Sequence, residues 1–254
     1  MEKFNALKVK NDIVEWIRQW FEENGKGCNA IIGISGGKDS SIAAALCVEA
    51  LGKDRVIGVT MPNTVQVTED ALNQTMNAVN DVVKSLGIVC YTVPINAPYC
   101  SLIHCIENAM NKDVSEQTAI NLAPRIRMST LYAVSQSCNG RVVNTCNLSE
   151  DWVGYSTRWG DSVGDFAPLK SFTVTELKQI GYELAHLLPK HLVDRVPTDD
   201  LCGKTDEDNL GFTYAVLDKY IRTGKCEDVK VKELIDEKHR KNLFKERPIP
   251  KFEY

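Results

Sequence analysis

Residues 30–51 read AIIGISGGKDSSIAAALCVEAL, and this stretch decides the class of fold. Ala30 to Ile34 form a short, fully apolar run, which predicts a buried strand. The small and polar residues of SGGKDS follow, and the alanine-rich apolar segment after them predicts a helix. A strand, a glycine-rich turn and a helix in direct succession predict one unit of a parallel α/β sheet.

The same alternation continues along the chain. Three more strands are predicted, at 55–61 (RVIGVTM), 88–93 (IVCYTV) and 142–145, and helices are predicted at 9–23, at 68–86 and over most of 99–139. We therefore expect a Rossmann-like, doubly wound parallel sheet with helices on both faces and helical extensions at both termini. The length is consistent with one domain spanning residues 1–254.

Two polar stretches interrupt the periodic pattern. Residues 147–169 show no clear period and are rich in Gly, Asp, Ser and Trp, so we expect a functional loop there. Residues 198–209 form a second, acidic loop. Between them, Thr173 and Glu176 have the spacing of a capping box, which predicts a helix running to Leu188, and the end of the chain is predicted helical to about Phe244.

The composition excludes several classes of protein. Lys and Arg number 30 against 34 Asp and Glu, a formal net charge of −4, and without basic clusters this disfavours binding to nucleic acid or a membrane surface. No apolar run approaches the roughly 20 residues of a membrane span, and the first residues lack a secretory signal. The nine cysteines include no Cys-x-x-Cys pair and the four histidines are scattered, which favours reduced thiols and a cytoplasmic location over a zinc site.

The loop Gly33–Ser40 has the chemistry of an anion site. Its small residues let backbone amides approach an anion, and the helix that follows offers its positive end. Ser35 and Ser40 add hydroxyl donors, while Asp39 is a suitable ligand for magnesium. The string is neither a Walker A loop nor a GxGxxG fingerprint. Two glycines alone would indicate a tight turn; the whole string between strand and helix favours an anion site.

The string SGGKDS resembles the pyrophosphate-binding loop of the adenine-nucleotide α-hydrolase-like ATP pyrophosphatases. Within that group the rest of the chain resembles the ammonia-dependent NAD synthetases. The segments that carry this resemblance are MPNTVQVTEDA, NLAPRIRMSTLYAVS, NTCNLSED, GYSTRWGDSVGDFAPL, VPTDDL and the tail KERPIPKF. Their order and spacing cover about two hundred residues.

The resemblance implies roles for particular residues. Asp39 and Glu150 would be the catalytic pair and would hold Mg²⁺, with ATP as co-substrate. Four residues would bind deamido-NAD: Arg125, Arg158, Asp165 and Lys245. The ATP-binding residues would be Gly33, Ile34, Ser35, Gly36, Gly37, Lys38, Asp39, Ser40, Gln66, Thr145 and Thr198.

Four positions depart from the family pattern. Val174 replaces a lysine that contacts ATP, and Lys170 or Lys178 nearby would have to substitute for it. Thr60 replaces a frequent arginine. Phe244-Lys245 replaces a His-Lys pair, and Arg158 replaces a lysine, which keeps the charge but changes its geometry.

The resemblance also implies a reaction, the last step of NAD biosynthesis. The nicotinate carboxylate of deamido-NAD attacks the α-phosphorus of ATP, and ammonia then attacks the adenylate to give NAD and AMP. The chain has no room for a glutaminase domain, so we expect free ammonia as the nitrogen source. A homodimer with the deamido-NAD site at its interface is implied as well.

Two other interpretations remain open. A tRNA-modifying adenylating enzyme could use the same loop, but it would predict a basic surface and often paired cysteines. A non-catalytic nucleotide-binding module could retain the fold. The presence of both Asp39 and Glu150 disfavours the second interpretation, because a protein that only binds nucleotide has less need of two metal ligands.

Overall fold

The computed structural model describes residues 4–65, 67–195 and 205–253. Its centre is a parallel four-stranded sheet in the order β3-β2-β1-β4. The strands are β1 (Asn29–Gly33), β2 (Val56–Thr60), β3 (Val89–Thr92) and β4 (Gly140–Val142). Four strands are found as predicted and the predicted α/β class is confirmed, but β4 ends at Val142, where the predicted fourth strand (142–145) begins.

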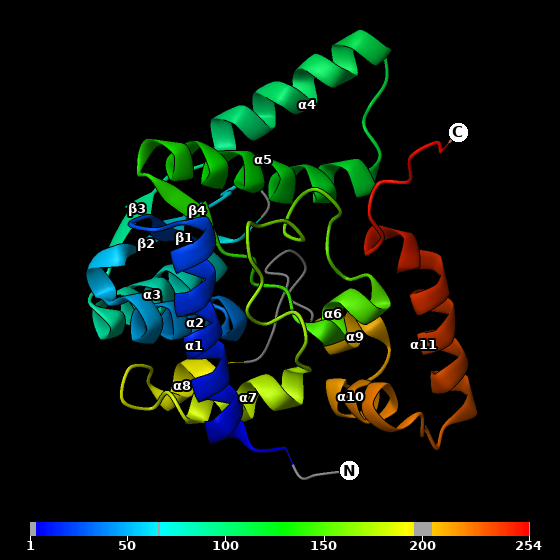
Figure 1. Ribbon diagram of the computed structural model, residues 1–254. Coiled ribbons are helices and arrows are strands. Elements are labelled where there is room, and N and C mark those ends of the chain that lie inside the picture. The colour runs from blue at the N-terminus through cyan, green and yellow to red at the C-terminus, as the bar shows by residue number, and fades with distance from the viewer. Residues whose placement is uncertain (1–3, 66, 196–204, 254) are drawn as a thin grey trace.

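Helices cover both faces of this sheet, as predicted (Figure 1). On one face, α1 (Ala6–Asn24), α2 (Lys38–Leu51), α3 (Glu69–Leu86), α7 (Val174–Tyr182) and α8 (Lys190–Val193) enclose the largest apolar core. On the other face, α5 (Glu116–Ser137) lies across the strands over a smaller core, and α4 (Asn96–Met110) projects beyond it. Ile31 and Ile32 of β1 point into opposite cores and are fully buried.

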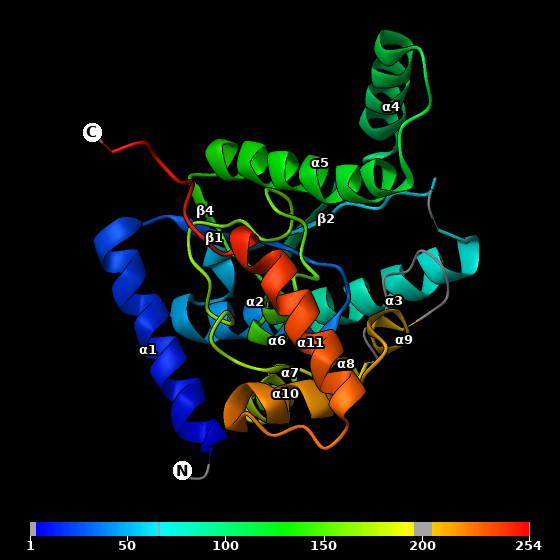
Figure 2. The same ribbon diagram turned by 90° about the vertical axis from the view of Figure 1, so that its right-hand side faces the viewer.

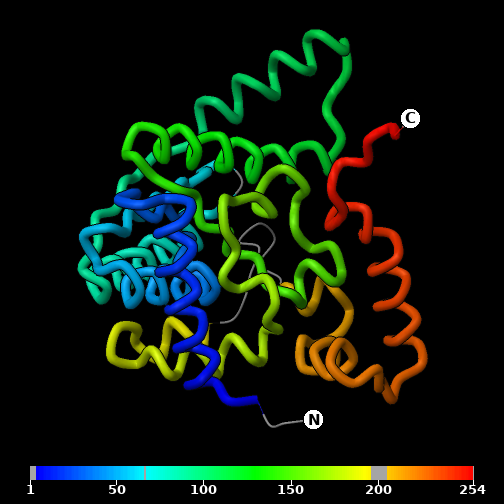
Figure 3. Tube along the Cα trace, in the orientation of Figure 1, coloured from blue at the N-terminus to red at the C-terminus, as the bar shows by residue number. Residues whose placement is uncertain are grey.

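The C-terminal part of the chain packs as a third apolar cluster. Its side chains come from α6 (Leu148–Val153), from Val174 at the start of α7, and from α9 (Asp206–Leu210), α10 (Tyr214–Thr223) and α11 (Val229–Asn242). The 3₁₀ turn η2 (Leu243–Lys245) follows α11. The irregular segment 154–172 winds between α5 and α7, as the tube in Figure 3 shows. This arrangement brings the end of the chain to the same irregular segment.

Three further predicted boundaries are wrong. Residues 147–169 contain α6, which is too short to show a helical period and which begins because the Asn147 side chain caps it. The segment predicted as one helical stretch at 99–139 is two helices, separated where Asn111 takes a left-handed conformation. The Thr173–Glu176 capping box is confirmed, but its helix ends at Tyr182 instead of Leu188.

The second predicted loop, 198–209, lies partly outside the described residues. Its described end is helical, because Thr205 and Asp208 form a capping box that begins α9. Within the described ranges, no helix is long and apolar enough to cross a membrane. The eight cysteines in those ranges are unpaired, as predicted.

Candidate active site

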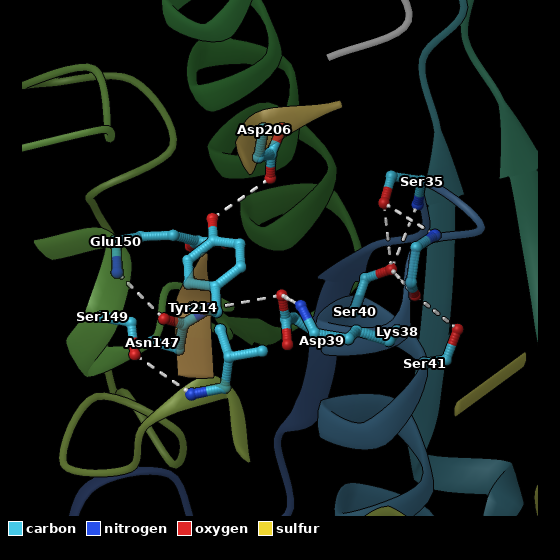
Figure 4. A network of polar contacts seen from close by, with 12 residues as sticks. Ser35, Lys38, Asp39, Ser40, Ser41, Asn147, Ser149, Glu150, Asp206 and Tyr214 are labelled. Atoms are coloured by element: carbon cyan, nitrogen blue, oxygen red, sulfur yellow. Dashed lines mark hydrogen bonds and ion pairs between the residues drawn. The ribbon is translucent and has the colours of Figure 1, made fainter. Parts of the chain in front are cut away.

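The loop between β1 and α2 is closed by its own serine side chains. The hydroxyl oxygens of Ser35 and Ser40 lie 3.1 Å apart, and the Gly37 amide donates to Ser35 Oγ. The hydroxyls of Ser40 and Ser41 both donate to the Gly37 carbonyl, at 3.1 and 2.7 Å. Hydrogen bonds among four residues of the stretch 35–41 thus fix the shape of the loop (Figure 4).

The loop ends at the N-terminus of α2, which Gly37 caps without a side chain. The first-turn amides of a helix have no acceptor within the helix, and the helix dipole makes this end positive. An anion at this point would therefore meet several donors at once.

Gly36 is required by both conformation and space. Its φ is +75°, and a Cβ there would lie 2.8 Å from Nη1 of Arg195 and 3.0 Å from the Thr75 carbonyl oxygen. Arg195 Nη1 donates to the Gly36 carbonyl at 2.9 Å. The carbonyl is thereby held against Arg195, which fixes the middle of the loop from outside.

Asp39 lies where the loop meets the C-terminal cluster (Figure 4). Its Oδ2 accepts from Lys38 Nζ at 2.8 Å and from Asn147 Nδ2 at 3.3 Å. Its Oδ1 is buried and has no hydrogen-bond partner among the described residues. Burial alone would lower the pKa of Lys38, but Asp39 and Glu150 raise it, so this lysine is a firmly charged partner.

Asn147 joins the two predicted metal ligands through the two ends of one amide. Its Nδ2 donates to Asp39, and its Oδ1 accepts from the Glu150 backbone N–H at 3.0 Å. The pKa of Glu150 rises from 4.5 to about 8, because its carboxyl group is removed from water and lies near the charge of Asp39. The structure therefore brings Asp39 and Glu150 together, with unfavourable electrostatics when both are ionised.

Two tyrosines and a third carboxylate border this pair. The hydroxyls of Tyr214 and Tyr155 donate to the two oxygens of Asp206, at 3.2 and 3.3 Å. The Tyr214 ring lies 5.9 Å from Lys38 Nζ. Burial and the charges of Glu150 and Asp206 raise the pKa of Tyr214, which keeps its hydroxyl protonated.

The described residues contain no group of three or more acidic, histidine or cysteine side chains that could hold a metal. Mg²⁺ is commonly bound by one or two carboxylates together with substrate phosphates. The orphaned Oδ1 of Asp39 and the nearby Glu150 provide such a pair beside an anion-binding loop. The residues present therefore fit magnesium carried on a nucleotide.

Three of the four predicted deamido-NAD residues border the segment 154–158. Arg125 Nε on α5 is 3.4 Å from the Arg158 carbonyl. Lys245 Nζ on η2 donates to the carbonyls of Gly154 and Ser156, at 2.6 and 3.2 Å. Burial lowers the pKa of Lys245. Three cationic side chains from distant parts of the chain thus gather at one segment.

The fourth, Asp165, is held at the edge of the sheet instead. Its Oδ2 accepts from the Val142 amide at 2.7 Å, and its Oδ1 lies 3.5 Å from the Tyr132 hydroxyl. Thr145 follows β4 two residues before Asn147. The predicted ATP contacts Gln66 and Thr198 lie outside the described residues.

The valine at position 174, where the family pattern has a lysine, has a structural explanation. Val174 is buried in the C-terminal cluster at the start of α7, and its amide donates to Ser149 Oγ. Lys170, offered as a replacement for the missing lysine, is paired with Asp151 and Glu246 at 2.8 Å each. The valine therefore contributes packing at this position, and Lys170 is engaged elsewhere.

Sequence reasoning missed Asn147, Arg195, Asp206 and Tyr214 as parts of the site. For Asn147 a signal existed, because asparagine three residues before Glu150 has the spacing of a helix N-cap. The others have no local signal, because their contacts join positions far apart in the chain.

The fold and this site define a nucleotide-binding α/β protein whose anion loop connects the central strand to a helix. The model of the NAD synthase family matches residues 9–248, and the chain belongs to this family. It is 36% identical over 256 residues to the NH(3)-dependent NAD(+) synthetase of Finegoldia magna, covering 98% of each chain. It is 35% identical to that of Thermococcus sibiricus, covering 100% of this chain and 92% of the relative.

Solved structures show the same fold. The NMN synthetase of Francisella tularensis superposes with a TM-score of 0.88 at 27% identity, covering 99% of this chain and 100% of that one. The NH3-dependent NAD synthetase of Campylobacter jejuni superposes with a TM-score of 0.76 at 24% identity, with the same coverage.

Proposed function

We propose that this chain is an ammonia-dependent NAD synthetase acting as one domain. It would adenylate the nicotinate carboxylate of deamido-NAD with ATP and release NAD, AMP and pyrophosphate after attack by ammonia. Membership of the family makes it an AMP-forming carbon–nitrogen ligase with ATP as substrate. The observation that carries the proposal is the placement of Asp39 and Glu150, linked by Asn147, directly beside the loop 34–40.

The loop would act on the departing pyrophosphate. Charge gathers on this leaving group in the transition state, and donors fixed in advance stabilise that charge without reorganising. The first-turn amides of α2, which no side chain caps, offer such donors, and the serine bonds hold the loop in shape beside them. Gly33 to Ser40 would hold the ATP phosphates, with Thr145 nearby, and Gln66 and Thr198 would complete the ATP site.

Asp39 and Glu150 would hold Mg²⁺ together with the phosphates of ATP. When bound, the ion supplies charge neutralisation for the leaving group. For this role Glu150 must be ionised, and Lys38 already offsets the charge of Asp39. No covalent enzyme nucleophile is required, because adenylation itself exchanges an oxide leaving group for AMP.

Arg125, Arg158 and Lys245 would bind deamido-NAD, with Asp165 at the edge of the same site. Guanidinium groups suit this role because they pair with phosphate or carboxylate through two parallel hydrogen bonds. The contacts of Arg125 and Lys245 with residues 154–158 support one site for these two cations and Arg158.

A homodimer is part of the proposal. Apolar side chains on α4, α5 and β3 are exposed in the single chain: Val89, Tyr91, Leu102, Met110 and Ile120. Figure 2 shows α4 projecting from the body of the molecule, where a second copy could cover it. Sedimentation equilibrium should give a dimer, and Leu102→Glu should shift it toward monomer; a monomeric native protein would contradict the proposal.

Amidation of nicotinate mononucleotide is a second candidate. It is favoured by the TM-score of 0.88 with the NMN synthetase of Francisella tularensis, compared with 0.76 for the NAD synthetase of Campylobacter jejuni. The two reactions share the same chemistry and differ only in whether the acceptor carries an adenylyl group.

One assay tests both candidates. Purified protein is given ATP, magnesium and ammonium with either deamido-NAD or nicotinate mononucleotide, and AMP and the amide product are measured together. Equimolar NAD and AMP, lost in Asp39→Ala, would support the proposal. A higher kcat/KM with the mononucleotide would favour the second candidate, and AMP without either amide would redirect the search to other acceptors such as tRNA.

A further inference from the structure

The side chain of Arg158 lies close to two aromatic rings. Its guanidinium carbon is 4.9 Å from the centroid of the Trp159 ring and 5.3 Å from that of Phe244. Its Nε is buried and has no hydrogen-bond partner, and no carboxylate pairs with it, within the described part of the chain. A cation shielded by two rings without a counter-ion is prepared for an anion that the chain itself does not supply.

The backbone that carries the Trp159 ring is strained. Trp159 has a φ of +61°, a left-handed conformation that a bulky aromatic residue rarely adopts. Trp159 and Phe244 remain 46% and 53% exposed, so neither ring fills the core. Gly160 closes the turn against Pro124, where a Cβ would lie 2.9 Å away. Strain beside two half-exposed rings indicates a functional arrangement more than a packing one.

Phe244 reaches Arg158 because the tail is docked on the same segment. Asn242 Nδ2 donates to the Val153 carbonyl at 3.2 Å, and Lys245 Nζ donates to the carbonyls of Gly154 and Ser156. Gly154 approaches so closely that a Cβ would lie 2.1 Å from Asn242 Cβ. The backbone on both sides of Phe244 is thus fixed against residues 153–156.

We propose that Trp159 and Phe244 are positioning residues that hold the Arg158 guanidinium for an oxyanion of the nicotinate nucleotide. A guanidinium held against two rings in this way can present its N–H groups for bidentate pairing with a carboxylate or a phosphate. The inference rests on the proposed function, because that function supplies the anionic nucleotide.

The test compares Phe244 variants in the steady-state assay. Phe244→Leu keeps an apolar side chain but removes the ring face, and we expect the KM for deamido-NAD to rise about threefold to tenfold. The kcat and the KM for ATP should change less than twofold, because Phe244 has no part in the proposed ATP site. Phe244→Tyr, which retains a ring, should restore the native KM. Phe252→Ala is the matched control, since Phe252 is a 92% exposed phenylalanine of the same tail.

Calorimetric measurement of deamido-NAD and NAD binding then identifies which oxyanion of the nucleotide pairs with Arg158. Deamido-NAD and NAD differ only in carrying a carboxylate or a carboxamide. If Phe244→Leu weakens deamido-NAD alone, the guanidinium pairs with the carboxylate; if it weakens both equally, it pairs with a phosphate. Either result supports the positioning role.

An unchanged KM and affinity in Phe244→Leu would overturn the inference, and so would an equal loss in Phe244→Tyr. Melting curves exclude simple unfolding as the cause of a loss. A native protein that makes no NAD would instead defeat the proposed function, and the inference with it, so the two failures are distinguishable.

Discussion

The two halves of the site are built in opposite ways. On the proposed ATP side, Ser35, Gly37, Ser40 and Ser41 bond to one another at the end of a strand buried on both faces, and Arg195 adds one contact from outside. On the nicotinate side, the segment 154–160 depends on contacts from Arg125, from Phe244 and from Lys245. In the proposed function, a mainly local loop would place backbone donors for a phosphate chain, whereas side chains from distant positions would assemble the site for the acceptor.

The largest effect that would sharpen this comparison is expected from Asp39→Asn. The variant keeps the hydrogen-bonding shape but removes the charge that would bind magnesium, so kcat should fall by at least about 100-fold. The affinity for deamido-NAD should be unchanged, because it would depend on the nicotinate side of the site. Rapid-quench measurement of AMP and calorimetry check the two statements, with the exposed Asp70→Asn on α3 as control. An equal loss of kcat and of affinity for deamido-NAD would show that the two halves of the site are not independent.

Glu150→Gln should reduce turnover and yet stabilise the protein. The pKa of Glu150 is about 8 when folded and near 4.5 when unfolded, so the folded chain binds more protons between these values. The native protein therefore loses stability as pH rises from 4.5 toward 8, and the glutamine does not titrate. In the absence of magnesium, the melting temperature of the variant should exceed that of the native protein by an amount that grows over this window. A constant difference with pH would contradict the burial of this carboxyl group.

Gly36→Ala should impair the ATP side by a smaller amount. The added Cβ would meet Arg195 and the Thr75 carbonyl and would take a left-handed conformation, so the KM for ATP should rise about tenfold. Gly27→Ala is a matched control, because Gly27 has a φ of +73° but no atom within 4 Å of the added Cβ. If both variants lose similar stability but only Gly36→Ala raises the KM for ATP, the effect comes from the loop and not from backbone strain alone.

The smallest effect is expected from Lys245→Met on the nicotinate side. Loss of the ammonium removes one cation and two bonds that anchor the tail, so the KM for deamido-NAD should rise about threefold to tenfold while the KM for ATP stays constant. Lys241→Met, which alters only an exposed pair with Glu237, should leave both constants unchanged. A rise in the KM for ATP, with no rise in the KM for deamido-NAD, would place Lys245 on the ATP side of the site.

The contrast between local and distant contacts also explains which features could be predicted from the sequence. The alternation of apolar runs and helices predicts the parallel sheet, and SGGKDS predicts the anion loop, because both depend on neighbouring residues. The short helix α6 escapes prediction, since six residues show no period. Arg195 and Tyr214 escape it because they reach the loop from about 160 and 180 residues away along the chain.

The Asn147 amide also has a consequence for how the protein assembles. A helix of six residues is not stable alone, and α6 begins on a cap whose other end is bound to Asp39. Glu150 therefore reaches its position only when the β4–α6 connection has docked on α2. A partly folded chain would carry no half-formed centre able to consume ATP, and amide hydrogen exchange should show α6 and the first turn of α2 opening as a single unit.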